Sequence, residues 1–191
     1  DANPRNGAAL TNLGRMYQDL GRHDDALAAF DRAIKLMPKH PVAPTSKARL
    51  LRETGQTDKA IAVLRGVISD MPGFAPAHVD LGLIYRDQGK YDDAIGCFEQ
   101  ATRIDPSIAS AWVNLADQLG QVNRLEEATA AISRALQIDD KFAAAHAVEA
   151  ELLARASKPE AAAAALRKAK ELAPEGDRVV RAVAFVKSVA A

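Results

Sequence analysis

The chain has 191 residues, of which 48% are apolar, and its 25 basic and 25 acidic residues give a formal net charge of zero. This balance excludes a global field that would attract nucleic acid or an anionic membrane. No apolar run approaches the roughly 20 residues of a membrane-spanning helix, and the single cysteine, Cys97, excludes an internal disulfide. We therefore expect a soluble protein with no nucleic-acid partner and no membrane insertion. These features do not encode the compartment, although a cytoplasmic location is favoured.

A period of 34 residues organises the chain from residue 7 to residue 176. Segment 75–108 has two clusters of apolar and small residues, with a glycine between them and a proline near the end. These signature residues are Leu81, Gly82, Tyr85, Gly89, Ala94, Phe98, Ala101 and Pro106. Most of these positions recur one and two periods earlier and later in the chain. Such a period is typical of a solenoid, whose units are too small to bury their apolar faces alone.

The first residues of the chain are predicted to end a preceding repeat. Pro4 stands 34 residues before Pro38, so residues 1–6 are interpreted as the tail of an earlier unit, and the chain as a piece of a longer protein. The first complete repeat is 7–40. Its apolar residues recur at three and four positions, which predicts a helix, and Gly21 is placed to end that helix in a left-handed turn.

The next four repeats are predicted at 41–74, 75–108, 109–142 and 143–176. Each is expected to be a helix, a short turn and an antiparallel helix. In the second repeat Lys47 occupies a position filled by leucine elsewhere, so its ammonium must reach solvent or find a partner. Asn123 takes the turn-glycine position of the fourth repeat, and the fifth repeat lacks a turn glycine.

The last segment, 177–191, is predicted to be a capping helix that does not begin another repeat. Val179, Ala182, Val183 and Val186 form one apolar face, and Arg178 is expected on the opposite side. A terminal unit of a solenoid leaves an apolar face open, and a capping helix covers it.

The recurring pattern resembles the tetratricopeptide repeat. The resemblance rests on Leu81-Gly82, Tyr85, Ala94, Phe98, Ala101 and Pro106, with Trp112 supplying the tryptophan that opens the family's pattern. It implies an all-α fold, a right-handed superhelical solenoid of antiparallel helix pairs, closed by a C-terminal capping helix. It also implies that the first helices of successive repeats line a concave face.

Residues at equivalent positions of the first helices are predicted to form a partner-binding groove. They include polar and charged side chains that the signature does not use. The predicted groove residues are Thr11, Asn12, Arg15, Ser46, Arg49, Arg52, Val79, Asp80, Leu83, Arg86, Val113, Asn114, Asp117 and Glu151. The early half is basic, and the later half, from Asp117 onward, is acidic.

These features favour a non-catalytic scaffold or adaptor that binds a protein or peptide in the groove, with an acidic group of the partner near Arg49 and Arg52. One alternative is a substrate-recruiting arm of a larger enzyme such as a glycosyltransferase, because Asn12 and Asn114 resemble part of that family's asparagine ladder. A second alternative is a self-assembling scaffold. For any single groove charge, pairing within a solvated face is a competing interpretation.

The sequence offers no catalytic, cofactor-binding or metal-binding constellation. The four histidines, His23, His40, His78 and His146, are scattered, and His78 and His146 are interpreted as packing residues near helix starts. No spacing brings a nucleophile near a base and oxyanion donors. We therefore expect no enzyme activity, cofactor or metal.

Overall fold

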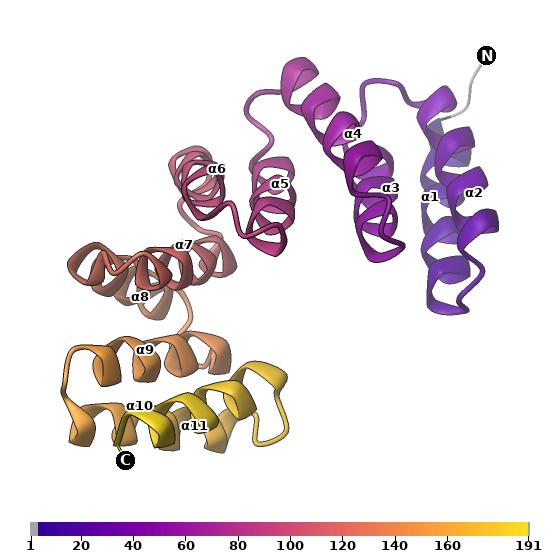
Figure 1. Cartoon of the computed structure of the whole chain (residues 1–191). Coiled ribbons are helices and arrows are strands. Elements are labelled where there is room, and N and C mark those ends of the chain that lie inside the picture. The colour runs from indigo at the N-terminus through magenta and orange to yellow at the C-terminus, as the bar shows by residue number, and fades with distance from the viewer. Residues whose placement is uncertain (1–3, 191) are drawn as a thin grey trace. The chain divides into compact units, whose positions relative to one another are not determined.

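The computed structural model describes the backbone of residues 4–190 and the side chains of residues 6–189. Within this range the chain forms helices joined by short turns, and no strand (Figure 1). The prediction of an all-α solenoid of helix pairs is confirmed. The helices are α1 (Pro4–Asp19), α2 (His23–Leu36), α3 (Val42–Glu53), α4 (Thr57–Asp70), α5 (Ala75–Asp87), α6 (Tyr91–Ile104), α7 (Ala109–Gln121), α8 (Leu125–Ile138), α9 (Ala143–Arg155), α10 (Pro159–Leu172) and α11 (Asp177–Ala190).

The chain divides into two compact units. Unit 1 is Asp1–Gly89 and holds α1 to α5, whereas unit 2 is Lys90–Ala191 and holds α6 to α11. The boundary falls between α5 and α6, inside the third 34-residue segment. Helix α1 begins at Pro4, so three of the residues interpreted as a preceding tail, Pro4, Arg5 and Asn6, are helical, while residues 1–3 lie outside the described range.

The turn inside each helix pair contains a left-handed residue, and these residues are spaced 34 apart. Gly21, Gly55 and Gly89 have φ values of 71°, 75° and 71°, and Asn123 and Ser157 take the same place with 62° and 56°. The following backbone N–H reaches back five residues, as from Arg22 to the carbonyl of Tyr17 at 2.8 Å. This hydrogen bond satisfies a carbonyl at the helix end and sets the start of the second helix.

Close packing explains why small residues recur in each pair. A Cβ at Gly14 would lie 2.5 Å from Cε1 of Phe30, so α1 and α2 could not approach as they do with a larger residue there. Phe30 is fully buried with Ala26 and Leu50, which joins the first pair to α3. In the same unit Lys47 finds the partner that its position required, since its Nζ lies 2.6 Å from Oδ1 of Asp31.

Helix α11 caps unit 2, and the placement of one of its residues differs from the expectation. It begins 34 residues after α9, in the register of a further first helix. Its apolar residues Val179 and Ala182 are buried against α9 and α10 as expected. Arg178, expected on the solvent side, instead turns its long side chain into the unit, where 21% of that side chain is exposed.

Candidate functional site

The predicted groove residues lie on the first helices of the pairs and are divided between the two units. Unit 1 contributes residues of α1, α3 and α5, and α3 packs against both of the other helices. Unit 2 contributes residues of α7 and α9, and α9 packs against both α7 and α11. Each unit therefore carries its own part of the predicted site.

Several predicted groove residues are buried and have local roles. The hydroxyl of Thr11 donates a hydrogen bond of 3.0 Å to the carbonyl of Gly7, one turn earlier in α1. Thr11 and Val113 are 5% and 7% exposed, so these side chains are largely withheld from a partner. Ser46 is also buried, whereas Asn12 is exposed and Asn114 is half-buried.

In unit 1 a buried carboxylate holds an exposed arginine. The Nε of Arg49 donates to both carboxylate oxygens of Asp80, at 2.9 Å each. Asp80 has a side chain only 6% exposed, while that of Arg49 is 52% exposed. Neither terminal nitrogen of Arg49 donates a hydrogen bond to another of the described residues. Asp80 therefore fixes the guanidinium while leaving its two terminal amino groups available to a ligand.

Further arginines extend this positive surface. Arg86 donates to Oδ1 of Asp87 through Nε at 3.1 Å and through a terminal nitrogen at 2.8 Å. Nε of Arg52 lies 3.3 Å from Oδ2 of the same carboxylate, so one Asp87 serves two arginines. Arg15 is exposed and makes no ion pair with a carboxylate in the part of the chain that the structure describes. We call Arg15, Arg49, Arg52 and Arg86 the arginine surface.

The half-buried apolar residues of α5 accompany this surface. Val79 and Leu83 were both predicted to face the groove, and both are partly exposed. Val79 directly precedes Asp80, the carboxylate that holds Arg49. The unit 1 part of the predicted site therefore combines guanidinium groups with some apolar area.

In unit 2 the predicted acidic residues are bonded to the capping helix. The two terminal nitrogens of Arg178 donate to the two oxygens of Asp117, at 2.9 and 2.7 Å. One of them also donates to Oε2 of Glu151, at 3.1 Å. The side chains of Asp117 and Glu151 are only 10% and 13% exposed. We call Asp117 and Glu151 the carboxylate site; in this structure it holds an arginine of its own chain.

Burial shifts the pKa of the charged groups in both units. Loss of hydration raises the pKa of Asp80, and the hydrogen bond and charge of Arg49 offset only part of this effect. Loss of hydration also raises the pKa of Glu151, against the opposing charge of Arg178. Burial alone would lower the pKa of Arg178, but its hydrogen bonds to Asp117 and the two carboxylate charges raise it. The ionised forms of Asp80 and Glu151 therefore carry a cost of lost hydration even when they are paired.

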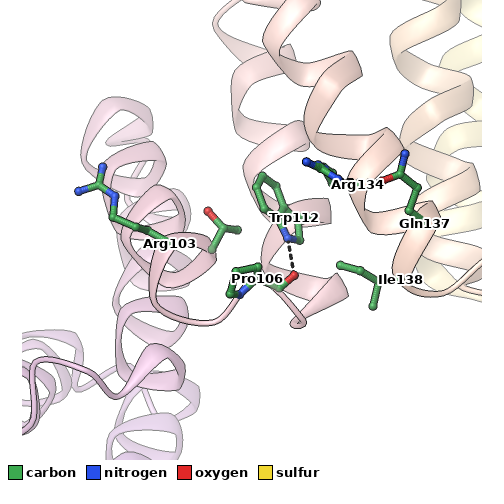
Figure 2. Close-up of a pocket in the computed structure, with 7 residues that line it drawn as sticks. Arg103, Pro106, Trp112, Arg134, Gln137 and Ile138 are labelled. Carbon is green, nitrogen blue, oxygen red and sulfur yellow. Dashed lines mark hydrogen bonds between the residues drawn. The ribbon is translucent and has the colours of Figure 1, made fainter.

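The sequence analysis did not identify Arg178 as a residue of the site. It also missed hydrogen bonds from ring nitrogens near the helix starts to carbonyls of the preceding turns. The indole Nε1 of Trp112 donates to the carbonyl of Pro106 at 2.9 Å (Figure 2). The Nε2 of His146 lies 2.9 Å from the carbonyl of Asp140 in the next repeat. The interval of six residues is the same in both, so a ring N–H at this position closes the turn between repeats.

A hollow of about 390 Å³ lies beside Trp112 and contains no predicted groove residue. In Figure 2 Arg134 lies beside the indole ring, whereas the guanidinium of Arg103 points away from it. Among the described residues there is no helix long and apolar enough to cross a membrane. The same residues include no group of three histidine, cysteine, aspartate or glutamate side chains arranged to hold a metal ion.

Family models for the tetratricopeptide repeat match residues 7–40, 75–108 and 109–142, which together make up more than half of the chain. The chain belongs to the tetratricopeptide repeat family. Repeats of this family are generally non-catalytic modules, so membership indicates a protein–protein interaction scaffold. A search of curated proteins found no match.

Solved structures of tetratricopeptide repeat proteins have the same fold. A thermophilic protein of Thermus thermophilus is 24% identical with a TM-score of 0.75, over 95% of this chain and 99% of that one. MamA from Desulfovibrio magneticus RS-1 is 19% identical with a TM-score of 0.72, over 90% and 97% of the two chains. The protein YrrB is 16% identical with a TM-score of 0.68, over 92% and 90%. At these identities the likeness shows the fold alone.

Proposed function

We propose that the chain is a non-catalytic scaffold whose unit 1 binds an acidic segment of a partner protein through the arginine surface. The observation that carries this proposal is the way in which Asp80 holds Arg49. A buried carboxylate that engages only Nε fixes the arginine and leaves its terminal nitrogens exposed. Two parallel N–H groups of this kind match the two oxygens of a carboxylate.

The local charge balance supports an acidic ligand. Four guanidinium groups are present, and two carboxylates, Asp80 and Asp87, contact them. Arg15 has no carboxylate partner among the described residues. The surface therefore has an excess of positive charge, although the chain as a whole is neutral. An acidic peptide would restore this balance, and the half-buried Val79 and Leu83 offer apolar area to its neighbouring side chains.

One of the similar structures supports the idea that a protein of this fold binds a peptide. YrrB is described as having an unusual peptide-binding site, and we extend only the binding of a peptide to this chain.

We also propose that residues 41–74 and 143–176 are the second and fifth repeats. Their support is that α3, α4, α9 and α10 keep the register and that Gly55 and Ser157 keep the left-handed turn.

The test is fluorescence anisotropy with a labelled peptide rich in aspartate and glutamate. The variant Arg49→Glu/Arg52→Glu should weaken binding by at least about tenfold, because hydrogen bonds to charged groups contribute about 1.5–3 kcal/mol each. The matched control is Arg32→Glu, which reverses one charge on the exposed side of α2. Equal affinity for the wild type and the double variant would refute the proposed function.

A further inference from the structure

We propose that the hollow beside Trp112 in unit 2 is a second binding site, which takes an aromatic side chain of a partner peptide flanked by acidic residues. The hollow has a volume of about 390 Å³ and is lined by residues of α6, α7, α8 and the turn between α6 and α7. We call it the tryptophan pocket. It goes beyond the function proposed for unit 1, because it lies in the other unit and requires an aromatic group as well as negative charge. Either proposal can fail without the other.

The apolar part of the tryptophan pocket is built around a ring that is held in one orientation. The indole Nε1 of Trp112 donates to the carbonyl of Pro106 at 2.9 Å, so the polar atom of this partly exposed ring is already satisfied (Figure 2). Pro106 and Ile138 line the pocket together with the ring, and Ile138 is 42% exposed. Such a surface favours an aromatic ligand, because contacts between two rings add to the free energy gained by burying apolar area.

The charged residues that line the tryptophan pocket are both arginines. Figure 2 shows Trp112 between Arg103 of α6 on one side and Arg134 of α8 on the other. Neither arginine makes an ion pair with a carboxylate of the described residues, and this includes Glu99, one turn before Arg103 on α6. One terminal nitrogen of Arg134 donates to Oε1 of Gln137 at 3.1 Å, which leaves its other N–H groups available. Two available guanidinium groups, one on each side of an apolar surface, select an acidic group on each side of an aromatic residue.

The carboxylates of the adjoining turns are directed to other partners. One oxygen of Asp105 accepts hydrogen bonds from the backbone N–H and the hydroxyl of Ser107, at 3.0 and 2.6 Å. One oxygen of Asp139 accepts from the backbone N–H of Lys141 at 3.0 Å. These two residues and Asp140 lie close in sequence to residues of the pocket, but they do not line it. Their charges act on a ligand through water and salt, which screen them, whereas an acidic group in the pocket would accept hydrogen bonds from the arginines directly.

The equivalent hollow of unit 1 shows which of these features belong to the repeat. It has a volume of about 320 Å³. Four of its lining residues stand two periods before Pro106, Trp112, Arg134 and Ile138 of the tryptophan pocket, and they are Pro38, Pro44, Gly66 and Asp70. Among the described residues that line it there is no aromatic ring and no arginine, and its two carboxylates would repel an acidic group. The repeat thus provides the hollow, and the side chains of unit 2 equip it for an aromatic and acidic ligand.

The experiment uses intrinsic fluorescence, because Trp112 is the only tryptophan of the chain. The probe is the peptide Gly-Glu-Phe-Glu-Gly, capped at both ends and titrated into the full chain. A ring packed on the indole excludes water, so the emission of Trp112 should shift to shorter wavelength and saturate. A peptide with alanine in place of phenylalanine keeps the charge, and one with glutamine in place of both glutamates keeps the ring. Each should bind at least about fivefold more weakly than the probe.

Variants of the two arginines test the selection by charge. Arg103→Gln/Arg134→Gln should weaken binding of the probe by about tenfold, or about threefold for each exposed ion pair that is lost, while circular dichroism shows the same helix content. The matched control is Arg32→Gln, three periods before Arg134 and also exposed, which should leave the titration unchanged.

A variant of unit 1 separates this proposal from the proposed function. Arg49→Glu/Arg52→Glu removes charge from the arginine surface and should leave the response of Trp112 to the probe unchanged. Loss of that response would overturn the proposal, because the peptide would then act from unit 1. An emission that does not change with added probe, or equal affinities for the probe and for either altered peptide, would also overturn it.

Discussion

The first helices of unit 1 and unit 2 use the same repeat position in opposite ways. Arg49 of α3 and Asp117 of α7 are two periods apart, yet one is an exposed cation and the other a nearly buried anion. In unit 1 the buried member of the pair, Asp80, comes from the next first helix. In unit 2 the cation comes from the capping helix. The repeat thus determines where each charged side chain lies. Whether the charge stays accessible to a ligand depends on the residue with which that side chain pairs.

The largest effect should come from breaking the ion pairs of the two units. Arg178→Ala removes the guanidinium that is hydrogen-bonded to two nearly buried carboxylates, and it should cost about 3–5 kcal/mol of stability, mainly in unit 2. Arg49→Ala should cost less, because its half-exposed guanidinium is screened by solvent. Urea unfolding followed by circular dichroism measures both, with Lys187→Ala on the exposed side of α11 as the control. A larger loss of unfolding free energy for Arg49→Ala than for Arg178→Ala would contradict the proposed difference between the two units.

An intermediate effect should come from exchanging the turn residues. Unit 1 has glycine in its left-handed turns, whereas Ser157 adopts φ 56° in unit 2. Ser157→Gly should therefore stabilise the chain and Gly55→Ser should destabilise it, each by about 1 kcal/mol. Melting temperatures of the two variants provide the measurement. Melting-temperature shifts of the same sign for the two variants would show that the turns at residues 55 and 157 are not equivalent.

The pH dependence of stability should report the carboxylate site. Because the folded pKa of Glu151 is raised above its usual value of 4.5, its ionisation costs stability as pH rises through the folded pKa, and protonation at lower pH removes that cost. Glu151→Gln lacks this dependence. Its melting temperature should equal or exceed that of the wild type at pH 7, and this advantage should shrink as the pH falls toward 4. An advantage that grows on acidification would contradict the assignment.

The smallest effect should come from Lys47, the lysine in a leucine position. Its ammonium contacts an Asp31 side chain that is 50% exposed, so solvent screens the pair. Lys47→Leu loses that pair and gains apolar contact, and we expect a change below about 0.5 kcal/mol. In unit 2 the equivalent residue, Leu115, is 5% exposed, and Leu115→Lys should be far more costly. Comparable losses for the two variants would show that Asp31 holds Lys47 more firmly than its exposure implies.

Local pattern explains most of the fold and only part of the candidate site. The signature residues and the turn positions follow from spacing, since helix faces and left-handed turns depend on neighbours in sequence. The pairing of Arg49 with Asp80 spans 31 residues, and that of Arg178 with Asp117 spans 61. Such pairs depend on how far a flexible side chain reaches between helices, and spacing does not encode this. Arg178 was placed on the solvent side for that reason.

The most direct test of the account is nuclear magnetic resonance of the arginine Nε–H groups in the full chain during titration with the acidic peptide. The account predicts shifts for the groups of the arginine surface, strongest for Arg49, with the Nε–H of Arg178 unchanged because Asp117 and Glu151 repel the ligand. Shifts centred on Arg178, or no selective shift in unit 1, would contradict the claim that the arginine surface of unit 1 binds the acidic peptide.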